Sequence, residues 1–150
     1  MSSFVIREAT DADRRWAAGV MSSSEPWLTL RRSFEACLIA CSSSVDVLYV
    51  AECERQPCGL ALVRERGLAG APYLVSIAVA ETYRGQGIGE QLLRFVEDLF
   101  RGRFRHLFLC VSSFNSRARV FYERHGYRAV GALPDFIVDG HAETLMMKRL

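Results

Sequence analysis

The chain has 150 residues, is half hydrophobic and carries a formal net charge of +2. This length predicts a single domain, 1–150, with a buried core. Scattered positive charge argues against nucleic-acid binding, and an apolar run of the ~20 residues that cross a membrane is missing. With no basic segment ahead of an apolar stretch at the N-terminus, we expect a cytoplasmic protein without a signal peptide.

The cysteine pattern argues against a metal site. No two cysteines form the C-x-x-C pair of a zinc ribbon, and Cys37 and Cys41 have no histidine beside them. The odd number of cysteines, five, favours reduced thiols in a bacterial or other cytosolic protein.

Apolar spacing and turn residues predict the elements of the N-terminal half. We expect a strand at 4–7, helices over roughly 11–21 and 33–41, a hairpin of strands 47–51 and 58–63, a turn at 67–72, and a strand at 73–79. Thr10 or Asp11 is suited to cap the first helix, because short polar side chains accept hydrogen bonds from the free N–H groups there.

The C-terminal half continues with alternating helices and strands. We expect a helix from the glycines near 88 to about 100, a strand at 106–111, a helix at 116–125 ended by Gly126, an extended segment at 127–138 interrupted by Pro134, and a last strand at 143–147. Asp139-Gly140 predicts a two-residue hairpin turn. The order β-α-α-β-β-β-α-β-α-β-β describes an α/β protein, an α+β mixed sheet with helices on both faces.

A glycine-rich turn lies between the strand Ile77-Ala78-Val79 and the amphipathic helix that follows. The free N–H groups and the dipole of a helix N-terminus favour phosphate, and glycine lets a ligand approach the backbone. The spacing excludes a dinucleotide fingerprint, because Glu90 stands where its third glycine would fall. It also excludes a P-loop, because the only lysine is Lys148.

The remaining pattern, R-x-x-G-x-G at Arg84–Gly89, resembles the coenzyme A pyrophosphate motif of the GCN5-related N-acetyltransferase (GNAT) family. The run Asn115–Tyr127 resembles that family's N-x-x-A-x-x-[FL]-Y-[ED]-x-x-G-[FY] pattern at every position. The resemblance covers about residues 45–150. It implies the GNAT acyl-CoA N-acyltransferase fold, with acetyl-CoA as cosubstrate and no metal.

The resemblance also implies a role for each matched position. In the family, a splayed gap beside the strand that precedes the glycine turn admits the pantetheine arm, so Ile77–Val79 would bind it and the Val79 N–H would stabilise the oxyanion. The Tyr122 phenol would protonate the leaving thiolate, and Asn115 would bind pantetheine or cap its helix. The cofactor-binding positions are Ile77, Ala78, Val79, Arg84, Gly85, Gln86, Gly87, Ile88, Gly89, Glu90, Asn115 and Tyr122.

The general base is left open. Pro26-Trp27, Ile77–Val79 and Asn115–Tyr127 also resemble the bacterial ribosomal-protein alanine N-acetyltransferases, which carry a glutamate base on the strand before the asparagine loop. Cys110 stands at that position, and a neutral thiol is a poor base for an alkylamine.

Three carboxylates could act as the base through water: Glu81, which we adopt as the catalytic candidate, Asp135 and Glu143. Solvent alone would suffice for an amine of lowered pKa. We expect Trp27 and Cys110 to border the acceptor.

The expected function is acetyl transfer from acetyl-CoA to a primary amine of a small molecule. Direct attack is expected, because nothing basic beside Cys110 in the sequence would activate it as a nucleophile. Two alternatives stay open: a protein or peptide Nα-acetyltransferase, and a non-catalytic acyl-CoA-binding regulatory module. Family members are often dimers, and nothing in the sequence decides between a monomer and a homodimer.

Overall fold

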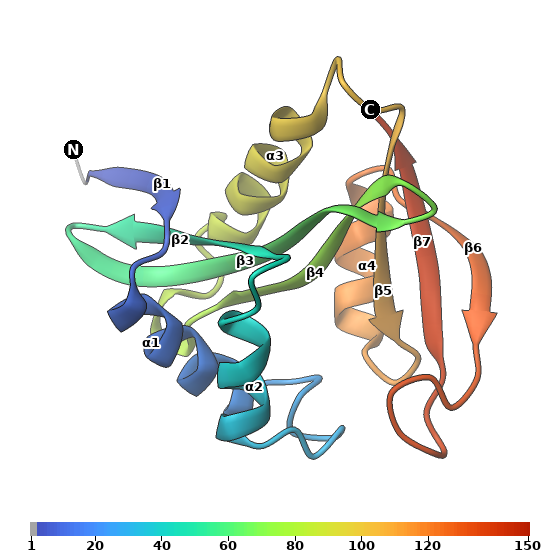
Figure 1. Ribbon diagram of the computed structural model, residues 1–150, viewed down its shortest axis with the longest axis horizontal. Coiled ribbons are helices and arrows are strands. Elements are labelled where there is room, and N and C mark those ends of the chain that lie inside the picture. The colour runs from blue at the N-terminus through green and yellow to red at the C-terminus, as the bar shows by residue number, and fades with distance from the viewer. Residues whose placement is uncertain (1–2) are drawn as a thin grey trace.

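One mixed β-sheet organises the computed structural model, which describes residues 3–150 (Figure 1). Within that range the sheet has seven strands in the order β1-β2-β3-β4-β5-β7-β6. Neighbouring strands are antiparallel except β4 and β5, which are parallel. The strands are β1 (Phe4–Glu8), β2 (Val47–Cys53), β3 (Gln56–Leu68), β4 (Ala71–Val79), β5 (His106–Ser112), β6 (Arg128–Leu133) and β7 (Glu143–Arg149).

Helices cover both faces of the sheet, as Figure 1 shows. They are α1 (Asp11–Ser22), α2 (Phe34–Cys41), α3 (Ile88–Phe100) and α4 (Ser116–Arg124), with a short 3₁₀ turn at Glu81–Tyr83. On one face α1 and α2 pack against β2 and β3, while on the other α3 packs against β3, β4, β5 and β7. The predicted fold class and element order are confirmed.

Side-chain alternation along β3 divides the core between these two faces. Leu60 and Leu62 pack against α1 and α2, whereas Ala61 and Val63 belong to the cluster under α3. The period of two in a strand sends successive side chains to opposite faces, so one apolar run serves both layers.

The hairpin between β3 and β4 is longer than the sequence predicts. Strand 58–63 extends to Gln56–Leu68, and the turn expected at 67–72 is present but shorter, at residues 69–70, because β4 already begins at Ala71. Gly67 lies inside β3, where an added Cβ would come within 2.6 Å of the Tyr73 Cβ. This glycine therefore permits a close approach of two strands and does not make a turn.

The two-residue hairpin expected at Asp139-Gly140 is also wrong. β6 ends at Leu133 and β7 starts at Glu143, so a longer loop joins them and the extended segment predicted to 138 is shortened. Pro134 cannot donate to a strand ladder, which ends β6. The Gly140 N–H instead donates to Asp135 Oδ1 at 2.7 Å and closes the loop.

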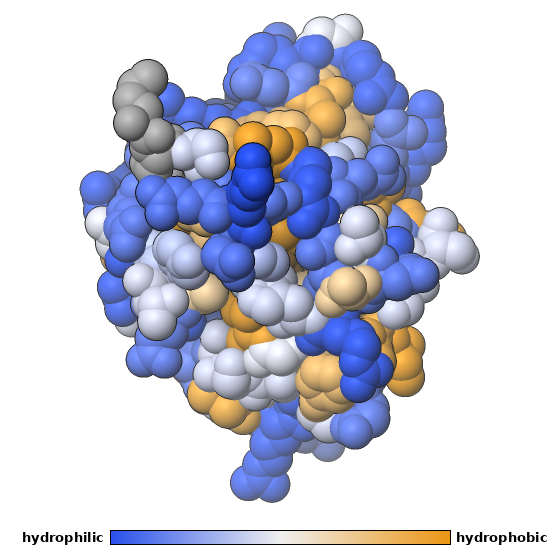
Figure 2. Space-filling model, turned by 90° about the vertical axis from the view of Figure 1, so that its left-hand side faces the viewer, coloured by the Kyte–Doolittle hydropathy of each residue, from blue (hydrophilic) through white to orange (hydrophobic). Residues whose placement is uncertain are grey.

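The edge strand β1 is held by charged side chains. Arg7 binds Asp13 at the start of α1 at 2.6 Å and also binds Glu52 on β2. The Arg7 guanidinium holds the pKa of the Asp13 carboxyl below its usual range. Figure 2 views this side of the molecule and shows mostly hydrophilic side chains, with apolar ones in separate groups. Charge at an edge strand opposes unwanted pairing with other chains.

A buried charged network fixes α3 against the last strand. Glu97 on α3 is 3% exposed, accepts a hydrogen bond from the Tyr127 hydroxyl at 2.8 Å and binds Lys148 Nζ at 3.0 Å. Burying a carboxylate is costly unless it is paired and hydrogen-bonded, and these two partners satisfy it. No helix within residues 3–150 has the length and apolar character to cross a membrane.

Lys148→Met tests this network. Removing the ammonium leaves the buried Glu97 carboxylate short of a partner, so the free energy of unfolding should fall by about 1–3 kcal/mol. Urea unfolding monitored by circular dichroism measures the change. Arg149→Met is the matched control on the exposed neighbour and should change stability by less than about 0.5 kcal/mol. Equal losses in the two variants would contradict a specific role for Lys148.

Candidate functional site

The gap expected beside the strand before the glycine turn is present between β4 and β5. The two strands pair at only two positions, Tyr73 with Phe108 and Leu74 with Leu109. Beyond Leu74, β4 remains paired with β3 as far as Val79, while β5 continues alongside β7. Figure 1 shows β4 and β5 diverging, with α4 behind the opening. The sheet is therefore splayed at its centre.

Backbone groups at the end of β4 point into this gap. The Ala80 N–H donates to the Cys58 carbonyl on β3 at 2.9 Å. N–H groups alternate in direction along a strand, so Ala78 also faces β3, whereas the N–H groups of Ile77 and Val79 face the gap. The predicted oxyanion donor, the Val79 N–H, is thus directed toward the gap, and the backbone of Ala78 is not.

The glycine turn leads directly into the N-terminus of α3. Gly85 and Gly87 have φ of +77° and +81°, in the left-handed region that favours glycine, and a Cβ at either position would meet nothing within 4 Å. The first N–H of α3 with an acceptor in the helix is that of Gln91, which donates to the Gly87 carbonyl at 3.1 Å. The N–H groups of Ile88–Glu90 have no intrahelical partner and are suited to bind an anion.

The Arg84 side chain turns back onto the protein. Its Nε donates to the Val79 carbonyl at 3.1 Å and its guanidinium reaches Ser24 Oγ at 3.0 Å. Arg84 therefore fastens the glycine turn to the end of β4 and to the segment after α1. The sequence motif gave it a phosphate role, whereas its contacts in the structure position the turn.

Tyr122 lies on α4, behind the gap, and is 6% exposed. Its ring packs edge-on against Phe121 and Tyr127, with centroids 5.2 and 5.7 Å away. Burial raises the pKa of the phenol, which keeps it protonated through neutral pH. Asn115 caps α4, because its side chain accepts a hydrogen bond from the Ala118 N–H at 3.3 Å.

Polar side chains from three strands gather on the face of the sheet that is opposite to α3. They are Tyr73 on β4, Cys110 and Ser112 on β5, and Glu143 on β7. They share this face because their neighbours along each strand, such as Leu74 and Val111, belong to the core under α3. Ser112 and Glu143 are paired residues in the β5–β7 ladder.

Glu143 is an unusual member of this cluster, because it is 4% exposed and incompletely paired. Within residues 3–150, the two buried side-chain oxygens without a hydrogen-bond partner are Glu143 Oε2 and Ser112 Oγ. Burial raises the pKa of Glu143, and the facing Ser112 hydroxyl and His141 offset part of this rise. Buried unsatisfied carboxylate oxygens are costly, so such a group indicates a role other than stability.

Cys110 and Tyr73 remain neutral at physiological pH. Burial raises the pKa of the Cys110 thiol, and the Glu143 charge adds to that rise. Burial, Cys110 and Glu143 together raise the pKa of Tyr73. Sequence reasoning missed Tyr73, since no local pattern reveals that β4 and β5 pair in the register that brings it to Cys110.

The other candidate residues are more dispersed. Glu81 is exposed in the 3₁₀ turn, and Asp135 is exposed in the β6–β7 loop. Trp27 packs against the core of α1 and α2. No group of three His, Cys, Asp or Glu in the described part of the chain is arranged to hold a metal ion. Of the three candidate carboxylates, the structure therefore brings only Glu143 beside Cys110.

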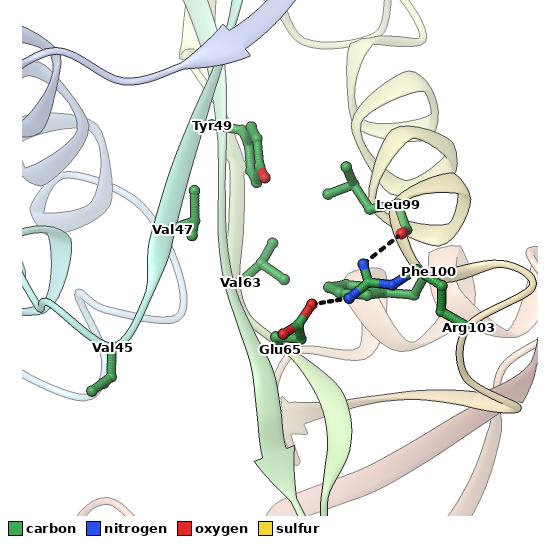
Figure 3. A pocket seen from close by; sticks show the side chains of 8 residues that line it. All are labelled: Val45, Val47, Tyr49, Val63, Glu65, Leu99, Phe100 and Arg103. Atoms are coloured by element: carbon green, nitrogen blue, oxygen red, sulfur yellow. Dashed lines mark hydrogen bonds and ion pairs between the residues drawn. The ribbon is translucent and has the colours of Figure 1, made fainter.

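A separate cavity of about 320 Å³ lies at the opposite end of α3, between that helix and β2–β3 (Figure 3). Val47, Tyr49 and Val63 line one wall, and Leu99 and Arg103 belong to the other. A rise of 1.5 Å per residue places Leu99 about 16 Å along the helix axis from the glycine turn. This cavity is therefore distinct from the gap between β4 and β5.

Glu143→Gln tests the cost of the buried carboxylate. Because the pKa of Glu143 is raised in the folded state, its charged carboxylate opposes folding above that pKa. The neutral amide of Glu143→Gln should therefore raise the free energy of unfolding at pH 7.5 by about 1–2 kcal/mol. The gain should shrink as the pH falls through the folded-state pKa toward 4.5, since wild-type Glu143 then becomes neutral as well. Thermal unfolding at pH 7.5 and 5.5 measures it, and an unchanged or reduced stability at pH 7.5 would contradict the assignment.

Comparisons with known proteins agree with this geometry. A family model described as "Acetyltransferase (GNAT) domain" matches residues 44–129. An uncharacterized N-acetyltransferase of Methanocaldococcus jannaschii is 37% identical over 82 residues, 53% of each chain. The 5-NmdU N-acetyltransferase of Pseudomonas phage PaMx11 is 34% identical over 84 residues, 56% of this chain and 59% of the other. The match thus spans little more than half the length of these curated relatives.

Solved structures share the fold across nearly the whole chain. Arabidopsis thaliana NAA60 in complex with acetyl-CoA has a TM-score of 0.80 at 18% identity and covers 99% of both chains. The ribosomal-protein-S18-alanine N-acetyltransferase of Escherichia coli has a TM-score of 0.76 at 17% identity, covering 98% of this chain and 94% of that one. The family model covers more than half of the sequence, and it includes the glycine turn and the whole Asn115–Tyr127 run. The chain therefore belongs to the GNAT acetyltransferase family.

Proposed function

We propose that this protein is an acetyl-CoA-dependent N-acetyltransferase that transfers the acetyl group to a primary amine of a small molecule. The observation that carries the proposal is the gap between β4 and β5, which opens beside the glycine turn after only two paired positions. A strand edge with free N–H groups, followed by a helix N-terminus, can hold an extended amide-containing arm at one end and its phosphates at the other.

The residues present fit acetyl-CoA. Its pyrophosphate would lie on the N–H groups of Gln86 to Glu90. Gly85 and Gly87 there have positive φ, and the space around them is open. Its pantetheine arm would follow the Ile77 and Val79 backbone, with Asn115 near the start of α4. Acetyl-CoA supplies a thioester, an activated acyl group with a thiolate leaving group.

The protein's own groups would then assist the transfer. The Val79 N–H, directed into the gap, would donate to the carbonyl oxygen as negative charge develops on it. Tyr122, kept protonated by burial, would donate its proton to the leaving thiolate. The raised pKa of Cys110 keeps its thiol neutral, which supports direct attack by the amine over an acyl-cysteine route.

The acceptor is assigned from Cys110 and not from the names of similar proteins. Those names differ in acceptor, since one refers to 5-NmdU and another to the alanine of ribosomal protein S18. Cys110 stands where the alanine N-acetyltransferases carry their glutamate, which favours a small-molecule amine. An amine panel with acetyl-CoA, read by thiol release, tests this: small alkylamines should react and peptides should not. Turnover with peptides alone would contradict the assignment, and acetyl-CoA binding without any turnover would indicate a regulatory module.

Tyr122→Phe should lower kcat by about 100-fold, because removing the hydroxyl removes the general acid for the thiolate. The Kd for acetyl-CoA, measured by calorimetry, should change by less than about twofold, because the ring stays packed. The loss of binding free energy should therefore be far below the roughly 1.4 kcal/mol that a tenfold change in Kd requires. Tyr49→Phe, in the separate cavity, is the control and should retain wild-type kcat. An unchanged kcat in Tyr122→Phe would show that the thiolate leaves without help from this phenol.

Gly87→Ala tests the glycine turn. At φ +81° an alanine is strained by about 1–2 kcal/mol, so the turn should shift and acetyl-CoA should bind about tenfold more weakly. Gly19→Ala is the matched control: it lies in α1 with helical φ and open space, so it should stabilise the protein by about 0.5–1 kcal/mol and leave binding unchanged. Wild-type affinity in Gly87→Ala would argue against a phosphate at this turn.

A further inference from the structure

The buried carboxylate of Glu143 lies one strand away from the gap between β4 and β5. It is on β7, directly across the ladder from Ser112, on the sheet face opposite Tyr122. Ser112 is the last residue of β5, the strand that forms one side of the gap. Glu143 Oε2 is buried without a hydrogen-bond partner, so this oxygen has an unused lone pair within the polar cluster of Tyr73, Cys110 and Ser112.

We propose that Glu143 is the general base of this enzyme, accepting through Oε2 the proton of a cationic primary alkylamine. The assignment rests on the proposed acetyltransferase function and specifies its acceptor as an amine that is protonated at neutral pH. It replaces Glu81 in this role, because Glu81 is exposed in the 3₁₀ turn after β4, away from β7.

The proton and electron balance of the step is complete with the groups at hand. The ammonium gives one proton to Glu143, and the freed nitrogen lone pair forms a bond to the thioester carbonyl carbon. The carbon–sulfur bond breaks, its electron pair leaves on sulfur, and the thiolate takes the Tyr122 proton. The second nitrogen proton restores the Tyr122 phenol, and Glu143 returns its proton to solvent. The products are the acetamide, the free thiol and one released proton.

The surroundings suit a base. An alkylammonium has a pKa of about 10.4, so a carboxylate with an ordinary pKa is a weak acceptor for its proton. Burial moves the Glu143 pKa upward and narrows that difference. The groups that face Glu143 are Cys110 and Ser112 on β5, Tyr73 on β4 and His141 in the preceding loop. Cys110 and Tyr73 stay neutral because their own pKa values are raised, so the carboxylate provides the negative charge that attracts a cation.

The test compares two acceptors that differ in basicity. One is the best alkylamine from the panel, and the other is its analogue with two fluorine atoms on the carbon next to the aminomethyl group, which lowers the ammonium pKa toward neutrality. Glu143→Gln removes the base, Glu143→Asp keeps a carboxylate, and Glu81→Gln removes the rival carboxylate. Glu54→Gln in the exposed β2–β3 turn is the matched control. Each variant is assayed for kcat/KM at pH 7 and for acetyl-CoA affinity.

Glu143→Gln should lower kcat/KM about 100-fold with the alkylamine and less than about fivefold with the fluorinated amine, which needs little help to lose its proton. Glu143→Asp should be at least about tenfold more active than Glu143→Gln, and the control should match wild type. All variants should bind acetyl-CoA with wild-type affinity, which also shows that they are folded.

Three results would overturn the inference. Equal losses with both amines would assign Glu143 a structural role, and wild-type activity in Glu143→Gln would remove any role. A selective loss in Glu81→Gln, with Glu143→Gln active, would return the base to Glu81. These outcomes all require an active wild-type enzyme. Wild-type protein that binds acetyl-CoA but acetylates no amine would instead refute the proposed function, and this inference with it.

Discussion

The short parallel pairing of β4 and β5 is the constraint on which the rest of the structure depends. Each strand is paired over most of its length with an antiparallel partner on its outer side, β4 with β3 and β5 with β7, and these partners hold the two strands apart beyond Leu74 and Leu109. Backbone N–H and C=O groups are thereby left unpaired in the middle of a sheet, where they would ordinarily be satisfied by a neighbouring strand. A ligand with its own amide groups can satisfy them.

A sheet divided in this way needs another connection between its halves, and α3 provides it. The helix packs on β3 and β4, and its buried Glu97 binds Lys148 on β7 together with Tyr127, the residue before β6. The charged network therefore joins α3 to β7 opposite Leu107, at the end of β5 where β4 and β5 still pair. Tyr127 is also the last residue of the second sequence motif, so its place in that motif has a structural reason: its hydroxyl donates to the buried Glu97 carboxylate and its ring packs against Tyr122.

The sequence predicted the features that depend on local chemistry. The glycine turn follows from Gly85 and Gly87 with positive φ ahead of an amphipathic helix, and the Asn115 cap and Tyr122 follow from a contiguous run on one helix. The element order and mixed sheet followed from periodicity. Gly67 misled because a glycine that permits close approach of two strands looks, in sequence, like one that turns the chain.

The polar cluster of Tyr73, Cys110 and Glu143 could not be assembled from the sequence. Its members lie on three strands that are far apart in the chain, and only the register of β4 with β5 and of β5 with β7 places them on one face. Glu143 was one of three candidate carboxylates, and sequence reasoning adopted Glu81 in its place. Burial distinguishes Glu143, because the other two carboxylates are exposed to water.

Two titratable groups with different proposed roles lie on opposite faces of the sheet near the gap. Tyr122 lies on the α4 face and Glu143 on the opposite face, and burial raises the pKa of both. The same physical effect has opposite chemical consequences, because a phenol with a raised pKa remains a proton donor at neutral pH whereas a carboxylate with a raised pKa becomes a stronger proton acceptor. On the proposed assignment, the thioester lies between an acid, Tyr122, and a base, Glu143. Burial shifts the pKa of each group in the direction that its role requires. A splayed sheet achieves this arrangement because it leaves a passage between two faces that a continuous sheet would keep apart.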